Sequence, residues 1–521
     1  MTSLLVGDLL EHAVAIHGSR VALADGDTRY TYREASERVR RLAAGLLGLG
    51  LTPGDHVAVL AGNSHRYWEA YFASHYAGTV LVPLNTRLAA AEIAFTLRDA
   101  RASALLVAAD FVEAVAGLRA ELPDLRHVIA LTGEAPAGML AYERLLAPAP
   151  PLTHAARHWR EDDMINLFYT SGTTGRPRGV MLSQRNVVAN AQHGLMNFPF
   201  LEDDVWLHAA PMFHVADAWA CYALTAAGAR HTFMRGFSPA AFAEVVRREK
   251  VTLSALVPAM IGLLVDHPGP SAADYASLRL LVFGGAPMPV DLLRAARRCF
   301  GPILCQGYGM TEAAPMLASQ KFEWLDYDSP AASSRLGSVG REVVGVRLRV
   351  CDAAGRELPP GEVGELTARG ANVMLGYWRR PEETRQTLRD GWLHTGDLGR
   401  IDDDGFVHIV GRLKDLIITG GENVSAAEVE AVLCRHPAVA QAAVIGLPDR
   451  QWGEAVAAVV VPRAGGTLSA PDLIAHCRRH LAGYKCPRHF AFVHQPLPQS
   501  GTGKVLKAEL HQRFAHLEVE G

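Results

Sequence analysis

Amphipathic stretches with helical spacing alternate with short apolar runs along the first part of the chain. The pattern predicts helices over residues 31–48, 65–77 and 90–100 and strands over residues 56–60, 80–82 and 104–107. A further apolar run at 280–283 leads through a glycine-containing turn into a predicted helix at 289–299. Strands that alternate with helices are typical of a largely parallel sheet covered by helices, so we predict an α/β fold.

The pattern changes from about residue 337 onward. Short β-like runs are separated there by turn signals at 352–355, 359–361 and 402–405. We therefore predict a small β-rich subdomain that follows the parallel α/β subdomains.

The C-terminal part returns to a mixed pattern, with predicted helices at 426–435 and 470–481 and a predicted strand at 455–461. A chain of 521 residues is too long for one ordinary core, so several domains are expected. The change of pattern indicates a large N-terminal domain over residues 1–411 and a small α+β C-terminal domain over residues 412–521.

Composition narrows the choice of function. Hydrophobic residues make up 49% and charged residues 20%, which is the balance of a soluble globular protein. The net charge of −3 and the absence of blocks of like charge argue against a nucleic-acid partner. No apolar run is long enough to insert into a membrane, and the first residues do not resemble a signal peptide. Seven cysteines without Cys-x-x-Cys spacing suggest reduced thiols, so we expect a cytoplasmic protein.

Residues 169–179 follow a predicted apolar strand and combine three glycines, four hydroxyl side chains and two arginines. Such a loop suits a polyphosphate, because glycines admit the main chain, hydroxyls donate hydrogen bonds and arginines neutralise charge. It is not a Walker loop, because no Gly-Lys-Ser/Thr follows at the required spacing. An ordinary surface loop is the alternative interpretation.

The loop resembles the phosphate loop of the adenylate-forming superfamily, which includes acyl-CoA synthetases, firefly-type luciferases and nonribosomal peptide adenylation domains. Further motifs of that superfamily follow in the expected order at residues 211–214, 284–287, 307–312, 391–397, 411–415, 420–423 and 500–504. The resemblance covers nearly the whole chain. One departure is Arg178, where the family often has lysine and where the planar guanidinium changes the phosphate contacts.

The resemblance implies how ATP is bound. It assigns the phosphates to Thr170, Ser171, Gly172, Thr173, Thr174, Gly175 and Arg178. It places adenine beside Gly285, Ala286, Tyr308 and Gly309. It assigns Thr311 to the α-phosphate and Glu312 to Mg²⁺, an ion that takes oxygen ligands and shares them with phosphates.

Three further residues complete the adenylation site that the resemblance implies. Asp397 is expected to accept both ribose hydroxyls, with Arg412 on the other side of the ribose. A structural ion pair beside a turn is the alternative for these two residues. Lys504 is expected to bridge the acid carboxylate and the α-phosphate, and the alternative is a solvated lysine near the terminus.

The same resemblance implies a second set of residues, which act in the transfer of the acyl group to coenzyme A. Lys414 matches a hinge about which the small C-terminal domain rotates, which makes that domain mobile. The rotation is expected to replace the Lys504 loop by Gly420 and Gly421, whose slim main chain admits pantetheine, while His214 borders the thiol path. A carrier protein is the alternative acceptor. Val215 stands where amino-acid-activating relatives usually have aspartate, and no carrier domain is fused, so free CoA is favoured.

The resemblance also outlines an acyl pocket from Ala216, Trp219, Ala220, Phe283, Gly284, Met310, Pro315 and Met316. These stretches contain no basic residue except His214, so a second carboxylate on the acid would lack a partner. We therefore expect an ATP-dependent acid:CoA ligase that uses Mg²⁺ and acts on a fatty, aryl or polycyclic carboxylic acid. Association into a homodimer is left open.

Overall fold

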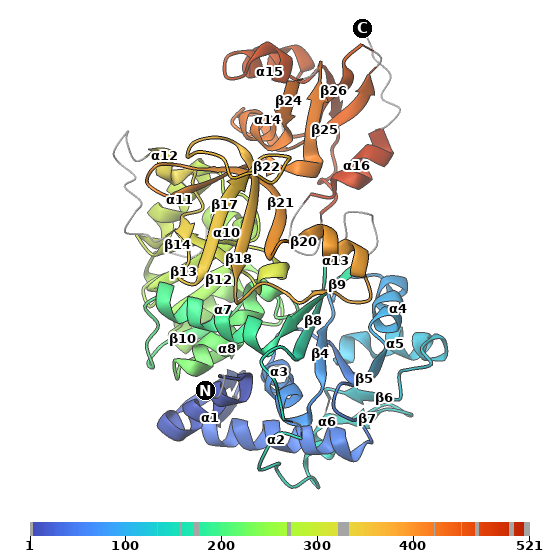
Figure 1. The fold of residues 1–521 in the computed structure, drawn as a ribbon. Helices are drawn as coiled ribbons and strands as arrows, with labels where there is room; N and C mark the ends of the chain where they lie inside the picture. The colour runs from blue at the N-terminus through green and yellow to red at the C-terminus, as the bar shows by residue number, and fades with distance from the viewer. Residues whose placement is uncertain are drawn as a thin grey trace. The chain divides into compact units, whose positions relative to one another are not determined.

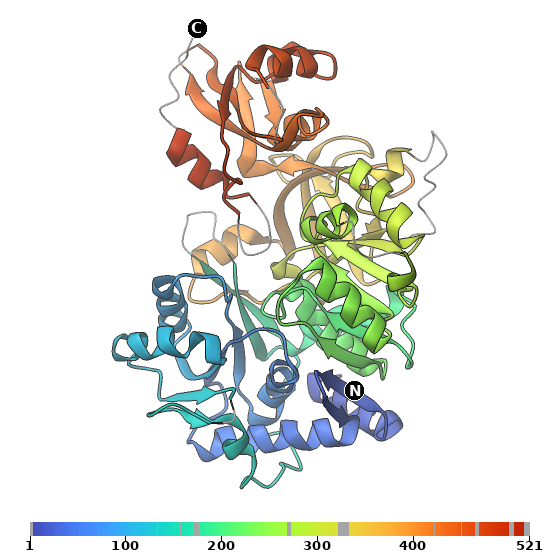
Figure 2. The same cartoon turned by 180° about the vertical axis from the view of Figure 1, so that it is seen from behind.

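The computed structural model describes residues 4–132, 134–156, 158–170, 177–267, 272–320, 333–420, 422–449, 451–463, 468–499 and 505–514. The chain forms two compact units, Met1–Arg347 with Ala368–Leu393 and Leu348–Thr367 with His394–Gly521. It passes between them within β17 (Val346–Cys351), β18 (Gly364–Gly370) and β21 (Trp392–Ile401). Parallel sheets, a β-rich part and a small C-terminal part confirm the predicted fold class (Figure 1 and, from behind, Figure 2). The domain boundary after residue 411 stays a prediction.

One sheet of the first unit is built from β3 (His56–Leu60), β4 (Val80–Pro83), β5 (Ala102–Val107), β6 (His127–Ala130), β7 (Leu140–Ala141), β8 (Met164–Thr170), β9 (Arg178–Ser183) and β19 (Gly376–Tyr377). In the described part of the chain the strand order is β19-β9-β8-β4-β3-β5-β6-β7. The strands from β8 to β7 run parallel, whereas β9 pairs antiparallel with β8 and β19 pairs antiparallel with β9. Every residue of β3 is buried, as expected for a strand covered on both faces.

Helices of this half of the unit are α1 (Val6–His17), α2 (Tyr32–Gly48), α3 (His65–Ala77), α4 (Ala90–Asp99), α5 (Val112–Leu118) and α6 (Tyr142–Leu146). Their ends follow local chemistry. The Thr31 hydroxyl accepts the Glu34 amide, and the Glu34 carboxylate accepts the Thr31 amide, which fixes the start of α2. At α3 the Ser64 hydroxyl accepts the Tyr67 amide, and Gly78 ends the helix in the left-handed region.

A second sheet of the first unit contains β1 (Val21–Asp25), β2 (Thr28–Thr31), β10 (Val205–His208), β11 (Arg230–Phe233), β12 (Leu253–Leu256), β13 (Leu280–Gly284), β14 (Leu304–Gly309), β15 (Met316–Gln320) and β16 (Arg341–Glu342). Over the described residues the order is β16-β15-β14-β13-β12-β10-β11-β1-β2. The strands from β14 to β1 are parallel; at the edges, β2 pairs antiparallel with β1, β15 with β14 and β16 with β15.

This sheet is accompanied by helices α7 (Gln184–Asn197), α8 (Val215–Ala226), α9 (Pro239–Glu249), α10 (Pro258–Asp266), α11 (Val290–Phe300) and α12 (Ser333–Leu336). Helices α7 and α8 pack against each other and lie side by side in Figure 1. The same unit includes α13 (Pro381–Thr387) and β20 (Leu388–Arg389), which pairs with the first residues of β21.

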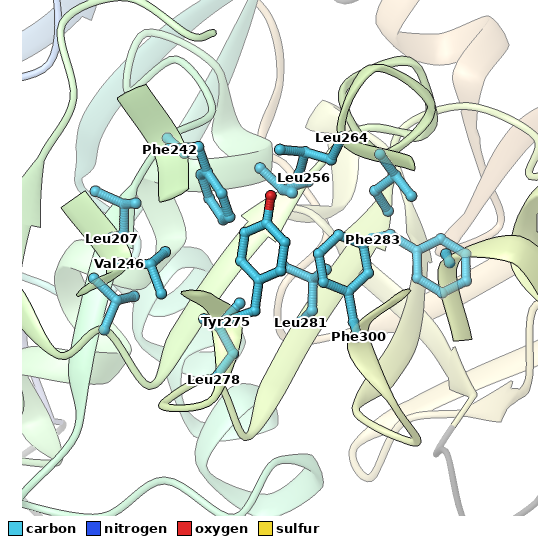
Figure 3. Packing of buried hydrophobic residues seen from close by; sticks show 14 of the residues in the cluster. Leu207, Phe242, Val246, Leu256, Leu264, Tyr275, Leu278, Leu281, Phe283 and Phe300 are labelled. Atoms are coloured by element: carbon cyan, nitrogen blue, oxygen red, sulfur yellow. The ribbon is translucent and has the colours of Figure 1, made fainter. Parts of the chain in front are cut away.

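An aromatic core lies between the second sheet and its helices (Figure 3). The Phe242 ring of α9 lies 6.1 Å from the Tyr275 ring, which in turn lies 5.0 Å from the Phe300 ring at the end of α11. Leu281 and Phe283 enter the same cluster from β13 and are fully buried. Packing on this core fixes the position of β13 in the sheet. The last residue of β13, Gly284, borders the cavity described below.

The second unit contains the greater part of β17, β18 and β21, with β22 (Val407–Arg412) paired to β21. The predicted turns form, because Gly355 donates to the Asp352 carbonyl oxygen and Gly405 to that of Asp402. A further sheet contains β23 (Leu416–Thr419), β24 (Glu422–Ser425), β25 (Val439–Asp449), β26 (Gly453–Pro462) and β27 (His489–Phe492). Its helices are α14 (Ala426–Leu433), α15 (Ala470–Arg478) and α16 (Lys507–Phe514). Among the described residues, no helix is both long and apolar enough to cross a membrane.

The aromatic core gives a direct test of the packing. Phe242→Ala should lower the free energy of unfolding by about 3–5 kcal/mol, because a fully buried ring is replaced by a cavity. The matched control is Leu263→Ala on neighbouring α10, where the side chain is 56% exposed and the change should stay within about 0.5 kcal/mol. Urea unfolding followed by tryptophan fluorescence measures both. Equal effects of the two substitutions would contradict the core as described.

Candidate active site

A cavity lies in the first unit at the carboxyl ends of β10, β12, β13 and β14. Ligands of open α/β sheets bind in this position, beyond the carboxyl ends of parallel strands. The described residues that line it are Ala210, His214, Val215, Ala216, Trp219, Ala255, Leu256, Val257, Val282, Phe283, Gly284, Gly285, Gly307, Tyr308, Gly309, Met310, Thr311, Pro315 and Met316. One side is glycine-rich main chain, and the other is apolar.

On the glycine-rich side, neighbouring segments of the main chain approach each other closely. A Cβ atom on Gly284 would lie 2.3 Å from the carbonyl oxygen of Gly307, and one on Gly309 would lie 1.8 Å from that of Pro315. Such contacts are far inside van der Waals distance, so only glycine fits at either position. The bare main chain leaves room beside Tyr308 for a flat ring, which an aromatic face binds well.

The apolar side of the cavity is formed largely by α8 and the start of β15. The Trp219 indole lines it, and its Nε1–H donates to the Ala216 carbonyl oxygen at 3.0 Å. Met316 contributes its thioether side chain as the first residue of β15. Among the described residues that line the cavity, only His214 and Tyr308 have ionisable side chains. The cavity wall therefore carries no fixed charge.

Seven of the residues predicted for the acyl pocket line the cavity, namely Ala216, Trp219, Phe283, Gly284, Met310, Pro315 and Met316. Ala220 is fully buried and does not belong to the lining. A helix turns by about 100° per residue, so the residue after Trp219 faces another direction and packs inside the unit. The proposed pocket therefore omits Ala220. Ala286, predicted near adenine, follows Gly285 but is not a lining residue either.

His214 caps the N-terminus of α8 through its imidazole, because Nδ1 accepts the Ala216 amide at 3.1 Å. Burial lowers the pKa of the His214 imidazole to about 4. The ring is therefore neutral near pH 7. Because Nδ1 is an acceptor, the proton resides on Nε2, and His214 offers the cavity a neutral hydrogen-bond donor.

Glu312 belongs to a buried polar cluster that the sequence did not reveal. The Tyr377 hydroxyl donates to its Oε1 at 2.8 Å, and the Nη2 atom of Arg178 lies 4.0 Å from the same oxygen. The Arg178 guanidinium lies over the Tyr377 ring at 4.3 Å and donates to Glu383 at 3.3 Å. Burial and the nearby Glu312 carboxylate raise the pKa of Tyr377, so its hydroxyl keeps its proton and remains a donor. Neither Tyr377 nor Glu383 lies in a sequence motif that would have indicated a role in the site.

The residues around Glu312 fit a magnesium ion that is shared with phosphates. One carboxylate oxygen of Glu312 is held by Tyr377, and the other has no hydrogen-bond partner among the described residues. Within the described ranges, no three His, Cys, Asp or Glu side chains are grouped to hold a metal. Mg²⁺ usually takes one or two carboxylates and completes its shell with phosphate oxygens and water, which agrees with this arrangement.

The phosphate loop is described only at its two ends. Thr170 closes β8 and pairs with Arg178 of β9, and its hydroxyl is buried without a partner among the described residues. The predicted phosphate contacts Ser171, Gly172, Thr173, Thr174 and Gly175 lie outside the described residues, as do Gly421 and Lys504.

Asp397 and Arg412 meet in the second unit, where they are direct neighbours in the antiparallel pairing of β21 and β22. The Nε atom of Arg412 lies 2.9 Å from Oδ1 of Asp397, and the Asp397 side chain is 8% exposed. The structure therefore contains the ion pair that the sequence left open. This pair and a ribose site are compatible, because a carboxylate has acceptor sites beyond those that one arginine occupies.

The predicted CoA residues also lie in the second unit. Lys414 belongs to a single turn, Leu413–Asp415, between β22 and β23. Gly420 has a φ of +60°, and a Cβ atom there would lie 2.8 Å from the Trp452 indole. The Trp452 ring is covered on one face by the Arg488 guanidinium at 4.3 Å. Trp452 and Arg488 were not predicted, because nothing in the local sequence indicates that they approach Gly420.

The comparisons with known proteins identify the family. Residues 10–378 match the family model of AMP-binding enzymes, and residues 428–504 match the model of the AMP-binding enzyme C-terminal domain. The chain therefore belongs to the family of AMP-binding enzymes. This result confirms the predicted superfamily and the predicted enzyme class, an AMP-forming acid–thiol ligase.

Individual relatives match over almost their whole length. The chain is 42% identical over 495 residues to a feruloyl-CoA synthase of Amycolatopsis sp, covering 95% of this chain and 96% of the relative. It is 37% identical over 500 residues to the fatty acid–[acyl-carrier-protein] ligase ScoC of Streptomyces coeruleorubidus, covering 94% and 93%. The solved structure of ATP-bound MatB from Rhodopseudomonas palustris superposes with a TM-score of 0.88 at 32% identity, covering 99% and 100%.

The contact between Tyr377 and Glu312 leads to a prediction for adenylation. Tyr377→Phe removes one hydrogen bond to a buried carboxylate, which contributes about 1.5–3 kcal/mol. We expect the rate of pyrophosphate release to fall roughly ten- to a hundredfold, because each 1.4 kcal/mol is a factor of ten. Single-turnover pyrophosphate release at several magnesium concentrations measures the effect.

A matched control is Tyr275→Phe. The Tyr275 hydroxyl is buried without a hydrogen-bond partner among the described residues, so its removal should leave the rate unchanged. If Tyr377→Phe is as active as Tyr275→Phe, the hydroxyl does not position Glu312.

Proposed function

We propose that this protein activates an apolar, bulky monocarboxylic acid with ATP and transfers the acyl group to coenzyme A. The observation that supports this proposal is the shape of the cavity. A glycine-rich side beside Tyr308, suited to adenine, continues into an apolar side formed by Trp219 and Met316. Nucleotide and acid can therefore meet in one space, as in-line attack on a phosphate requires.

The proposed substrate follows from the charge of the cavity wall. Because no lysine, arginine or fixed carboxylate belongs to the described lining, a second carboxylate on the acid would be buried without a partner. Burial of an unpaired charge costs several kcal/mol or more, so dicarboxylic acids are disfavoured. An aryl or polycyclic acid would contact the Trp219 indole and the Met316 thioether favourably. The 42% identical relative is named for an aromatic acid, which supports this choice.

In the first half-reaction, a carboxylate oxygen of the acid bonds to the α-phosphorus of ATP, and pyrophosphate leaves. We assign the phosphates to the loop from Thr170 to Arg178, the α-phosphate to Thr311 and the bridging charge to Lys504. Glu312, held by Tyr377, would bind Mg²⁺ together with the phosphates, and the ion would offset the charge of the leaving pyrophosphate.

In the second half-reaction, the thiol sulfur of CoA bonds to the acyl carbon, and AMP leaves with the oxygen that came from the acid. Asp397 would hold the ribose of AMP, and the Arg412 guanidinium would keep that carboxylate oriented. The neutral His214 lies at the base of α8 beside the acyl site and would border the thiol path. We assign the main chain at Gly420 and Gly421 to pantetheine, and the hinge between residues 1–411 and 412–521 to Lys414.

A carrier protein is the second candidate acceptor. A relative with 37% identity is named as a ligase for an acyl-carrier protein, and it covers nearly the whole chain. A carrier protein presents the same phosphopantetheine thiol, so the two acceptors share the chemistry at the acyl carbon. They differ only in what holds the far end of the pantetheine arm.

Pyrophosphate release from ATP with a panel of acids, with and without CoA, tests the proposal. Acid-dependent release that becomes multiple-turnover when CoA is added, with formation of the acyl-CoA, is the expected result. Release that continues past one turnover only with a phosphopantetheinylated carrier protein would favour the second acceptor. Absence of release with every acid would contradict adenylate formation.

Lys504 gives a prediction for the first half-reaction alone. An aimed cation beside developing phosphate charge contributes roughly a hundredfold or more in rate, so Lys504→Ala should stop adenylation and largely spare thioester formation from supplied acyl-adenylate. The control is Lys485→Ala, which removes a partly exposed ion pair with Glu428. ATP–pyrophosphate exchange at the level of the control would remove Lys504 from the mechanism.

A further inference from the structure

Gly194 lies in the last turn of α7, is buried, and faces the indole of Trp219 on α8. A Cβ atom at residue 194 would lie 2.7 Å from Cζ3 and 3.4 Å from Cε3 of that indole. Carbon atoms in contact prefer about 3.5–4.0 Å, so the outer ring of Trp219 occupies the space that any other side chain at residue 194 would need.

The remaining sides of the indole are also occupied by protein. Its Nε1–H is held by the Ala216 carbonyl oxygen at 3.0 Å. The rings of Phe198, Phe200 and Trp206 lie 6.0, 6.2 and 5.8 Å from it. The side chain of Trp219 also lines the cavity. Among these surroundings, the cavity is the open space into which a ring displaced from α7 can move.

We infer that Gly194 sets the size of the acid that this protein accepts, although residue 194 does not line the cavity. The missing side chain lets the Trp219 indole lie against α7, and this position leaves space for a bulky ring-bearing acid. A methyl group at residue 194 would displace the indole by about 1 Å into the acyl side. This inference deepens the proposed function and rests on it.

Gly194→Ala tests the inference through acid selectivity. We would compare kcat/KM for acid-dependent pyrophosphate release with ferulic acid, a bulky aryl acid, and with propionic acid, which is too short to reach a displaced indole. The ratio of the two values should fall at least tenfold in the variant, with the propionate value nearly unchanged. The melting temperature should stay constant or rise, because alanine favours a helix interior over glycine.

The matched control is Gly262→Ala in α10. Its Cβ would meet only a Leu292 methyl carbon at 3.9 Å, which is ordinary contact, so the ratio should not change. A loss of activity toward both acids alike in Gly194→Ala would indicate damage to the site as a whole and would overturn the inference. An unchanged ratio would overturn the inference as well, because the indole would then not have moved into the cavity.

A double-mutant cycle shows whether Gly194 acts through Trp219. In the Trp219→Ala background, the obstructing ring is absent, so Gly194→Ala should no longer change the selectivity ratio. Trp219→Phe, which retains a smaller ring, serves as a second background if Trp219→Ala does not fold. If the full change of selectivity persisted in a folded background, Gly194 would not act through Trp219.

The wild-type protein separates failure of this inference from failure of the proposed function. If no acid supports pyrophosphate release by the wild type, the proposed function fails, and the inference fails with it. If ferulic acid or another ring-bearing acid supports release, and Gly194→Ala leaves the selectivity unchanged, the inference alone fails.

Discussion

The close approach of the main chain at the ends of β13 and β14 is the constraint on which the site depends. Gly284 lies against the carbonyl oxygen of Gly307, and Gly309 lies against that of Pro315, at distances that leave no space for a Cβ atom. Because no side chain fills this region, the cavity has a bare wall beside Tyr308. The aromatic core below β13 keeps this wall in place, since Phe283 is anchored there.

The cavity and the polar cluster around Glu312 depend on different physics. The described lining of the cavity has no charged residue, and burial keeps His214 neutral near pH 7, so a ligand there would be selected by size and apolar contact. In the cluster, Glu312 and Arg178 carry charges that are largely removed from water, and such charges are stable only with partners. Tyr377 and Glu383 are those partners, and they hold the charges in position before any nucleotide binds.

Local sequence patterns predict the elements well where neighbouring residues decide the outcome. The strand at 56–60 and the helix at 65–77 coincide with β3 and α3, because an apolar run is followed by the Ser64 cap. The sequence does not reveal Tyr377 beside Glu312, Trp452 beside Gly420, or Gly194 beside Trp219. Each of these contacts joins segments that only the tertiary fold brings together. Family motifs located the cavity, but helix geometry removed Ala220 from its wall.

The central claim is that the acid is activated as its adenylate, and oxygen transfer tests it most directly. The protein would be incubated with ATP, CoA and its best acid carrying ¹⁸O in the carboxylate, and the products would be analysed by mass spectrometry. Attack of the carboxylate on the α-phosphorus predicts AMP with one ¹⁸O atom and unlabelled pyrophosphate. Unlabelled AMP, or label in inorganic phosphate, would contradict an acyl-adenylate intermediate.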